Sequence, residues 1–369
     1  MRRGVGSGST KRDSGKIFPF DFMPDPTLRS LAKSLRLSHS TISAALRNSP
    51  LVTAKTKARV RAAAEAAGYR RNPLAGALMS ELRRTRGRAF RGVIGVVILH
   101  EPERPAHGDK FFDQQIRGAR ARAEELGFTL EIFIVGDGHL TFKRLESILQ
   151  ARGISGLMLM PAWWDPNFNE LDWSRYAGVY SDYIIEEPPL HSICPDHYRS
   201  MTDALVRLQQ MGYRRPGLFV PRRHNDRLQN RWEGAFLAFQ RNNARTKFVP
   251  PLTAEEISRE NFSAWFRRHD PDVVLGHQIE TMKWMTACGA SIPKTHGFFC
   301  LNLIMTRAPC AGFNQLPDFI GARAIDIVTA QLYRNEFGVP KRGVLTTIPS
   351  LFVEGPTIRT IPPPRARRA

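Results

Sequence analysis

From residue 92 onward the sequence alternates short apolar runs with longer amphipathic stretches of helical period. The apolar runs are GVIGVVIL (92–99), FTLEIFIV (128–135), SGLMLMP (155–161), AGVYSDY (177–183), RRPGLFVP (214–221), PDVVLG (271–276) and HGFFCL (296–301). Apolar runs of strand length between helices are typical of βαβ units, whose parallel sheet is buried on both faces. A chain of 369 residues has room for two such sheets. We therefore predict an α/β core of two doubly wound parallel-sheet lobes behind an N-terminal all-α unit.

The predicted boundaries follow the changes in composition along the chain. Residues 1–26 mix Gly, Ser, Lys and Arg without any period, which is typical of a disordered leader. The segments that follow are a helical domain at 27–70, a hinge or linker at 71–90, a core at 91–361 and a basic tail at 362–369. Within the core, we expect one lobe from residues 91–188 with 312–343 and the other from residues 189–311 with 344–361.

Positive charge is concentrated at the N-terminal end of the chain. The formal net charge is +20, and residues 1–90 carry 19 Lys and Arg against 5 Asp and Glu. A concentrated basic segment suits a polyanion, because each neutralised phosphate releases condensed counterions. A solvated basic face explains the same charge without any partner. The charge therefore indicates nucleic acid only if the fold of the segment agrees.

Three short helical patterns precede the core. The first presents apolar residues on one side from Leu28 to Leu35, and Ser38 is the expected N-cap of a second that ends near Leu46. The third runs from about residue 54 to residue 67. Two helices across a four-residue turn, with small polar residues on the exposed face of the second, match a helix-turn-helix. A small helical bundle with a polar face matches this pattern too.

The candidate DNA contacts lie on and beside the second of these helices. The side chains expected to face base edges are those of His39, Ser40 and Ala44. The side chains placed for phosphates, which fix register without reading sequence, are those of Ser38, Thr41 and Lys55. The expected partner is double-stranded DNA.

The order of residues in this segment is specific. The run T-L-x-x-L-A-x-x-L-x-L-S-x-S-T-I-S-x-A-L-x-N, followed by V-T-x-x-T-x-x-x-V-x-x-A-A-x-x-x-G-Y-x-x-N-P-x-A, resembles the DNA-binding headpiece of the lac repressor (LacI) family, without gaps from Thr27 to about Met79. The resemblance implies a bacterial, cytoplasmic regulator at the nucleoid, by default a repressor. It also implies a homodimer that binds a near-palindromic operator with two headpieces. Two positions depart from the family: Arg36 stands where the turn usually has Gly, and Ala44 where an Arg usually contacts DNA.

The resemblance extends into the hinge. Residues 72–79, NPLAGALM, resemble the family's hinge helix, which folds on the operator. The hinge residues that the resemblance places against DNA are Asn72, Ala75 and Leu78. Leu78 matches the position that inserts into the minor groove and bends the duplex. Mutual packing of Leu74 and Leu78 within a helix is compatible with the same pattern.

The rest of the chain resembles the family's effector domain, which is similar to periplasmic sugar-binding proteins. Ligands of open α/β sheets bind at the carboxyl ends of the strands, between two lobes. The first-lobe candidates are Phe112, Trp163, Trp164 and Asp182. Tandem tryptophans can stack on a sugar ring, and they can equally pack at a rim. In the second lobe, Arg231 in R-W-E-G-A-F resembles the family's R-x-x-G, whose Arg bonds effector hydroxyls; a surface salt bridge is the alternative.

The second lobe departs from the family pattern around the expected pocket. His277 and Gln278 stand where the family usually has an Asn-Asp pair, and Asn302 stands where an Asp usually follows a strand. Gln315 still resembles the family's pocket Gln. Because a pocket with fewer carboxylates holds vicinal hydroxyls less strongly, the expected effector is a small molecule that is carbohydrate-like or of another kind. The alternative is an architectural or ligand-independent DNA-binding protein whose core serves only dimerisation.

Enzyme, metal and membrane functions lack a sequence basis. No GxGxxG, GxxxxGK[ST], GxSxG or HExxH run occurs, so we predict no catalytic activity and no cofactor. His191, Cys194 and His197 have a spacing seen in metal sites, but Asp196 is better explained as a helix cap, and we predict no metal. The longest apolar run, residues 93–99, is too short to cross a bilayer. The four cysteines form no CxxC pair, which fits a reduced cytosolic protein.

Overall fold

The computed structural model describes residues 28–46, 52–67, 91–101, 106–162, 167–183, 187–277, 280–306 and 308–361. The chain forms two compact units, Met1–Arg71 and Asn72–Ala369. The predictions that fall outside the described residues are the leader, the hinge with Asn72, Ala75 and Leu78, the tandem Trp163 and Trp164, Gln278 and the basic tail.

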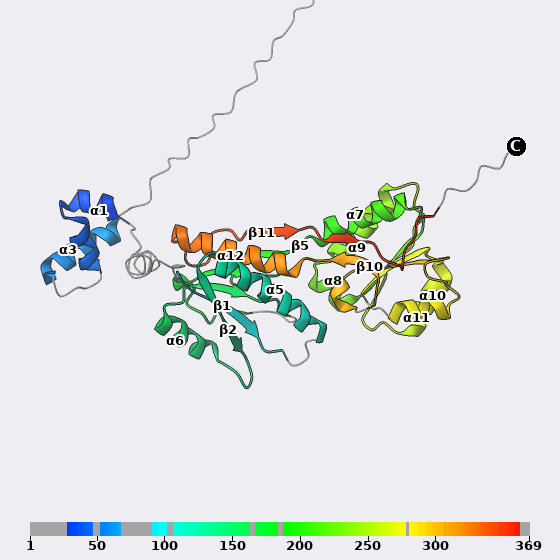
Figure 1. Cartoon of the computed structure of the whole chain (residues 1–369), viewed down its shortest axis with the longest axis horizontal. Coiled ribbons are helices and arrows are strands. Elements are labelled where there is room, and N and C mark those ends of the chain that lie inside the picture. The colour runs from blue at the N-terminus through cyan, green and yellow to red at the C-terminus, as the bar shows by residue number, and fades with distance from the viewer. Residues whose placement is uncertain are drawn as a thin grey trace, which may run out of the picture. The chain divides into compact units, whose positions relative to one another are not determined.

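The N-terminal unit contains the three helices that the sequence predicts. They are α1 (Leu28–Leu35), α2 (His39–Leu46) and α3 (Ala54–Ala66) (Figure 1). Leu31, Ile42 and Val60 are buried together, one from each helix, so a small apolar core holds the three in place. The predicted N-cap is confirmed, because the backbone N–H of Thr41 donates to Oγ of Ser38 over 3.1 Å.

The larger unit contains two six-stranded sheets. The first consists of β1 (Gly92–Leu99), β2 (Phe128–Val135), β3 (Gly156–Leu159), β4 (Ala177–Tyr180), β5 (His191–Pro195) and β11 (Leu345–Ile348), in the spatial order β11-β5-β4-β3-β1-β2. The second consists of β6 (Pro216–Pro221), β7 (Leu252–Ala254), β8 (Val273–Gly276), β9 (Gly297–Cys300), β10 (Ala311–Asn314) and β12 (Leu351–Val353), in the order β12-β10-β9-β8-β6-β7. All neighbours pair in parallel except β10 and β12, which are antiparallel. The predicted fold class is confirmed.

The lobe boundaries differ from those expected from the sequence. Both β5 and β11 belong to the first sheet, although residues 189–195 and 344–348 were predicted in the second lobe. Conversely, β10 belongs to the second sheet, although residues 312–314 were predicted in the first lobe. The chain therefore leaves the first lobe only after Pro195 and returns to it with the helix that follows β10. Neither β5 (HSICP) nor β11 (LTTI) is one of the apolar runs detected in the sequence, so no sequence pattern indicated which of the two sheets each strand joins.

Helices cover both faces of each sheet. In the first lobe they are α5 (Ala106–Glu125), α6 (Phe142–Arg152), α12 (Pro317–Arg334) and the 3₁₀ turn η1 (Trp173–Arg175). In the second lobe they are α7 (His197–Gln210), α8 (Arg222–Arg227), α9 (Arg231–Asn242), α10 (Arg259–His269), α11 (Glu280–Ala287) and the 3₁₀ turn η2 (Leu303–Met305). Figure 1 shows α5 beside α12 on one face of the first sheet and α6 on the other. This is the doubly wound layering that the apolar runs predict, because strands covered on both sides have no polar face.

The packing of α5 on α12 depends on two glycines. A Cβ added to Gly118 would lie 1.8 Å from the carbonyl oxygen of Asp318, and one added to Gly321 would lie 2.0 Å from the carbonyl oxygen of Gln115. The two backbones therefore touch in a reciprocal way, each helix presenting a glycine to a carbonyl of the other. This close approach fixes α5, which carries Phe111 and Phe112 on its first turns, against the first sheet.

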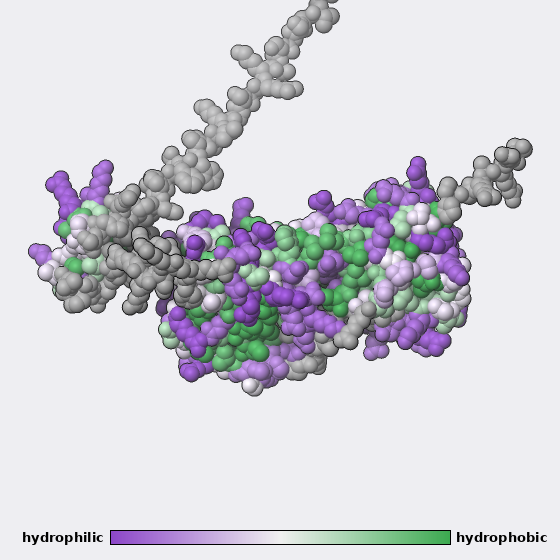
Figure 2. Space-filling view, viewed as in Figure 1, coloured by the Kyte–Doolittle hydropathy of each residue, from purple (hydrophilic) through white to green (hydrophobic). Residues whose placement is uncertain are grey.

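An apolar surface lies over β1 and β2 in the larger unit (Figure 2). β2 is an edge strand, and its residues Ile132 and Ile134 are 40% and 39% exposed. An edge strand with exposed apolar side chains is a surface that proteins usually cover. None of the described helices combines the length and the apolar content that a membrane span requires.

Candidate functional site

A cavity lies between the two lobes of the larger unit, at the carboxyl ends of their parallel strands. Its described lining residues are Gly108, Phe111, Phe112, Pro161, Ala162, Ser181, Asp182, Pro195, His197, His224, Arg227, Leu228, Trp232, His277, Asn302 and Gln315. The structure thus brings together five of the residues predicted from the sequence as effector contacts: Phe112, Asp182, His277, Asn302 and Gln315. They meet because each belongs to a strand end or to the first turns of a helix after a strand, and these positions converge on one edge of each sheet.

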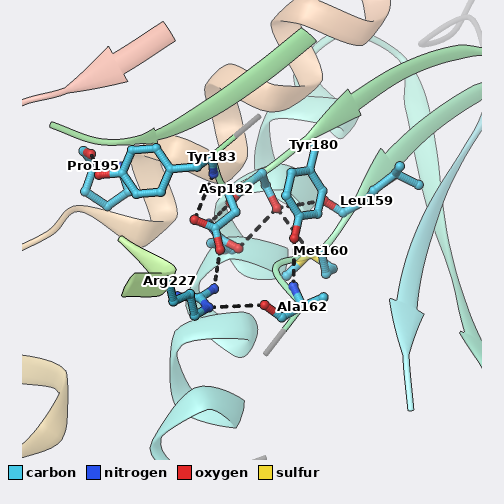
Figure 3. Close-up of polar contacts among 10 residues, drawn as sticks. Leu159, Met160, Ala162, Tyr180, Asp182, Tyr183, Pro195 and Arg227 are labelled. Atoms are coloured by element: carbon cyan, nitrogen blue, oxygen red, sulfur yellow. Dashed lines mark hydrogen bonds and ion pairs between the residues drawn. The ribbon is translucent and has the colours of Figure 1, made fainter. Parts of the chain in front are cut away.

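One ion pair crosses this cavity. Asp182, which follows β4 of the first lobe, pairs with the guanidinium of Arg227 at the end of α8 in the second lobe (Figure 3). Arg227 Nε also donates to the carbonyl oxygen of Ala162 over 3.2 Å, so one side chain holds two first-lobe loops. Burial raises the pKa of Asp182, and the charge of Arg227 acts in the opposite direction. The pair therefore connects the lobes in a largely dry environment, where its two charges interact strongly.

A set of hydrogen bonds holds the first-lobe wall of the cavity (Figure 3). The backbone N–H of Ala162 donates to the hydroxyl of Tyr180 over 3.0 Å, and the hydroxyl of Ser181 donates to the carbonyl oxygen of Leu159 over 2.9 Å. The N–H of Tyr183 donates to Oδ1 of Asp182 over 2.9 Å. Burial raises the pKa of Tyr180 above its usual range, so its hydroxyl stays protonated. Asp182 is therefore held in a fixed orientation toward the cavity.

The second-lobe wall is a cluster of aromatic rings. His197, His224 and His277 surround Trp232, with ring centroids 4.7, 5.5 and 4.9 Å from the indole. The Nε2 atoms of His224 and His277 lie 2.8 Å apart, so one ring donates an N–H hydrogen bond to the other. Burial lowers the pKa of His197 well below its ordinary value, and the positive potential of His277, Arg227 and Arg231 lowers it further. His197 is neutral at physiological pH as a result.

Sequence reasoning missed four of these side chains as site residues: His197, His224, Arg227 and Trp232. A signal existed for His197, because it is the first residue of α7 directly after β5 and therefore lies at a strand end. His224 and Arg227 lie on α8, which begins directly after β6, so the same strand-end signal existed for both. Trp232 comes from α9, which follows another helix, and the strand-end rule does not find it. The unusual density of His, Arg and Trp between residues 224 and 232 is the only sequence signal for it.

Solved structures share this architecture along most of the chain. A transcriptional regulator CelR–cellobiose complex matches 90% of this chain and 99% of its own, at 17% identity and a TM-score of 0.53. A LacI-family transcriptional regulator from Silicibacter pomeroyi has the same coverages, at 20% identity and a TM-score of 0.50. The lac repressor dimer bound to operator and the anti-inducer ONPF also has these coverages, at 16% identity and a TM-score of 0.50. The chain has the fold of the LacI-family regulators. No protein-family model and no curated protein matches the sequence.

Two of the predicted departures from the family pattern, His277 and Asn302, line the cavity of this LacI fold, as does Gln315, which matches the pattern. His277 is 6% exposed and forms part of the ring cluster, and Asn302 caps η2 by accepting a hydrogen bond from the N–H of Ile304 over 3.1 Å. Gln315 is also buried, and its Nε2 donates to the carbonyl oxygen of Leu301 over 3.0 Å. Two of the three residues are thus neutral amides and the third is an imidazole. This side of the cavity offers no described carboxylate to a ligand.

Arg231, predicted as an effector contact, lies beside the described lining rather than in it. Its guanidinium donates to Oε1 of Gln229 over 2.9 Å and stacks on the ring of Tyr183 at 4.5 Å. Tyr183 follows β4, so this cation–π contact of α9 is a second link between the lobes, beside that of Arg227 on α8. A direct role of Arg231 in ligand binding stays a prediction.

The spacing of His191, Cys194 and His197 produces no metal site. Oδ1 of Asp196 accepts the N–H of Arg199 over 3.0 Å, which confirms that Asp196 caps α7. Among the residues that the structure describes, no group of three or more His, Cys, Asp and Glu side chains is arranged to hold a metal ion.

The helical unit of this LacI fold presents some of the predicted DNA contacts. Ser38 and Lys55 are exposed, whereas Thr41 and Ala44 are half-buried. His39 belongs to α2, as does Ser40, but the side chains of both lie outside the described part of the chain. Arg36, at the turn position where the family usually has Gly, adopts a left-handed conformation with φ of 51°. The turn geometry is therefore retained with a side chain in place.

Proposed function

We propose that this protein is a sequence-specific DNA-binding transcriptional regulator of the LacI family, acting as a repressor under the control of a small-molecule effector. The observation that carries the proposal is the combination, in one chain, of a helix-turn-helix unit with a two-lobed core that holds a cavity at its strand ends. A helix-turn-helix reads DNA through its second helix. A cavity lined from two lobes responds to a ligand, because binding favours closure of the lobes.

DNA binding is supported by the fold and by the charge of the N-terminal unit. The helical unit has the predicted turn, cap and core, and it lies in the segment that carries most of the excess Lys and Arg. The lac repressor structure with the same fold is a dimer bound to operator. We assign the operator contacts to α2 and to the hinge, with Asn72, Ala75 and Leu78 in the minor groove.

Homodimerisation is supported by the apolar edge of the first sheet. One headpiece offers too few contacts for selective affinity, so two must act together on a near-palindromic site. The exposed Ile132 and Ile134 of β2 lie on the first lobe, whose strand β1 is the first core element after the hinge segment in the sequence. A second copy covering this edge would bury them.

Effector binding is supported by the cavity and by ligands of similar structures. One structure with the same fold is a complex with cellobiose, and a LacI-family regulator from Weissella paramesenteroides, at 11% identity and a TM-score of 0.52, contains bound glucose. We place a small molecule of comparable size in the cavity, between Phe112 of the first lobe and His277 of the second. The proposal includes no catalytic role.

In-vitro selection from random duplexes tests the DNA half of the proposal. Full-length protein should enrich near-palindromic sequences, and its affinity for them should fall steeply with salt, since the Lys and Arg of residues 27–90 contact phosphates. A variant that lacks residues 1–88 should enrich nothing and still sediment as a dimer. Enrichment by the truncated core would contradict the assignment of the headpiece.

Effector control separates a regulator from an architectural DNA-binding protein. In a regulator, a ligand of the cavity changes operator affinity by a coupling free energy of about 1–3 kcal/mol, and the operator changes ligand affinity by the same factor. An architectural protein would bind its DNA with unchanged affinity in the presence of any cavity ligand.

A further inference from the structure

A second hollow adjoins the cavity between the lobes. It is lined by residues of α5, η2 and the segments around β10: Lys110, Asp113, Gln114, Arg117, Asn302, Leu303, Ile304, Thr306, Asn314, Gln315, Pro317 and Val353. Asn302 and Gln315 line both spaces. A ligand that extends past these two amides from the inner cavity therefore enters the outer hollow.

The inner cavity has little negative charge to offer a ligand. Among its described lining residues, Asp182 is the only carboxylate, and it is ion-paired with Arg227. Two guanidinium groups, those of Arg227 and Arg231, lie in or beside this lining against the single carboxylate of Asp182, so the charges there sum to a positive value. A ligand that carries negative charge is favoured in the resulting potential. For a neutral polyhydroxylated ligand, the cavity has no free carboxylate that could accept hydrogen bonds from vicinal hydroxyls.

Two buried polar atoms of the inner cavity lack partners. Trp232 is fully buried and His197 is 4% exposed, and neither Nε1 of the indole nor Nδ1 of His197 has a hydrogen-bond partner in the described part of the chain. The indole N–H can only donate, so it needs an acceptor. A buried donor without an acceptor is costly, and a ligand that brings oxygen atoms would remove that cost.

The outer hollow carries a net positive charge. Lys110 and Arg117 lie about two helical turns apart on α5, so they share one face of that helix. Both are exposed, and neither forms an ion pair with a described residue. Asp113 is the only acidic side chain that the described lining contains, so one positive charge remains uncompensated.

We infer that the effector is a hydroxylated ring compound that carries a carboxylate or a phosphate. Its ring lies in the inner cavity against Trp232 and Phe112, and its anionic group reaches Lys110 and Arg117 in the outer hollow. The inference rests on the proposed function, since it names the ligand class of the same cleft. It differs from the neutral sugars of the similar structures because amides stand at Gln278 and Asn302, where the family usually has Asp, and because two cations, Lys110 and Arg117, line the adjoining hollow.

A matched ligand library tests the inference on the full-length protein. Each neutral aldohexose and pentose in it is accompanied by its uronic or aldonic acid and by its phosphate ester, and binding is measured by thermal shift and then by calorimetry. At least one charged member should bind, at least tenfold more tightly than its neutral counterpart, and its affinity should fall with ionic strength. The acid and ester arms distinguish a carboxylate from a phosphate. Equal or tighter binding of the neutral members, or binding of no member, would overturn the inference.

Variants of α5 locate the anionic group. The double variant Lys110→Gln/Arg117→Gln should weaken the charged ligand at least tenfold and leave binding of its neutral counterpart unchanged. Arg120→Gln is the matched control, because Arg120 is an exposed Arg of the same helix outside both linings, and it should change neither affinity. An unchanged affinity in the double variant would place the anionic group elsewhere and overturn the assignment.

The inference and the proposed function fail in different ways. If a neutral sugar binds and releases the selected operator, the function stands and the ligand class is wrong. If a charged ligand binds with the expected dependence on Lys110 and Arg117 but leaves operator affinity unchanged, the ligand class stands and effector control is wrong.

Discussion

Arg227 of α8 and Asp182 after β4 form an ion pair that ties the two lobes together across the cleft. Their side chains are 22% and 12% exposed, so water screens the pair only in part. Arg227 also reaches the carbonyl oxygen of Ala162, which adds a neutral hydrogen bond to the same connection. The cleft is thus closed by contacts of the protein itself, and a ligand must fit beside this pair or displace it.

Removal of Arg227 should destabilise the core in a pH-dependent way. In Arg227→Gln an ionised Asp182 lacks its counter-charge, which costs about 3–5 kcal/mol at a buried site. Burial already raises the pKa of Asp182, and loss of Arg227 raises it further. Protonation removes the uncompensated charge, so the difference in unfolding free energy between parent and variant should narrow as the pH falls. Denaturant unfolding between pH 5 and pH 8 measures this.

The neighbouring ion pair supplies the control for that experiment. Arg222 of the same helix pairs with Glu255 at 3.0 Å, but both side chains are at least half exposed. Arg222→Gln should therefore cost less than about 1 kcal/mol at every pH. If Arg227→Gln cost as little, the inter-lobe pair would not hold the cleft closed.

The core as a whole should lose stability on acidification through His197. Its pKa is lowered in the folded state, so below a pH of about 6.5 the unfolded chain binds a proton that the folded protein does not. Stability then falls by up to about 1.4 kcal/mol per pH unit until the folded pKa is reached. His197→Phe, which keeps an aromatic ring against Tyr183 and Trp232, should flatten the acid side of the stability profile. The exposed neighbour Tyr198, changed to Phe, should leave the profile as it is.

Glycine substitutions should separate backbone contact from helix propensity. Gly118→Ala drives a methyl group into the carbonyl of Asp318, and Gly321→Ala does the same at Gln115, so each should cost about 1–3 kcal/mol or more. Gly234 of α9 has nothing within 4 Å of an added Cβ, and Gly234→Ala should stabilise the protein by about 1 kcal/mol. Thermal unfolding of the three variants gives the comparison. Equal effects at Gly118 and Gly234 would contradict the close approach of α5 and α12.

How much of the fold the sequence predicts depends on burial. The strands covered on both faces, such as β1, β3 and β8, stand out as apolar runs. The strands β7, β11 and β12 are short and half-exposed, so their sequences have no apolar run to detect. Helix starts at Ser38 and Asp196 are predictable because capping is local chemistry.

The residues of the candidate site also differ in how far the sequence predicts them. Asp182, His277 and Asn302 follow strands, and the convergence of parallel strand ends brings them together without any knowledge of packing. Arg227 and Trp232 come from helices, and their place in the cavity depends on how α8 and α9 turn on the second sheet. The pairing of Arg227 with Asp182 and Ala162 is a contact between segments far apart in sequence, which no local pattern encodes.

The turn of the helix-turn-helix should tolerate, and even favour, glycine. Arg36 has a φ of 51°, a left-handed conformation that costs a residue with a side chain about 1 kcal/mol relative to Gly. Arg36→Gly should increase the hydrogen-exchange protection of α1 and α2 in the full-length protein. Lys33→Gly, three residues earlier inside α1, should reduce it, because there Gly lowers helix propensity. Reduced protection in Arg36→Gly would mean that the Arg side chain stabilises the turn by more than its backbone strain costs.

The hinge should contribute to specific but not to non-specific DNA binding. Leu78 matches the position that unstacks a base step in the minor groove, so Leu78→Ala should weaken binding to the selected operator at least tenfold through loss of that insertion. Binding to random duplex rests on phosphate contacts and should stay unchanged. Lys55→Gln is the contrasting variant, because it removes an exposed cation expected to contact a phosphate. Its affinity should fall equally for the selected operator and for random duplex. The slope of log affinity against log salt concentration should decrease by about one per half-site. Gel-shift titrations of both variants at several salt concentrations measure these slopes. If Leu78→Ala instead lost the same factor of affinity for the operator and for random duplex, Leu78 would not contribute to specificity. Its role would then be packing within the hinge, and specificity would lie in α2 alone.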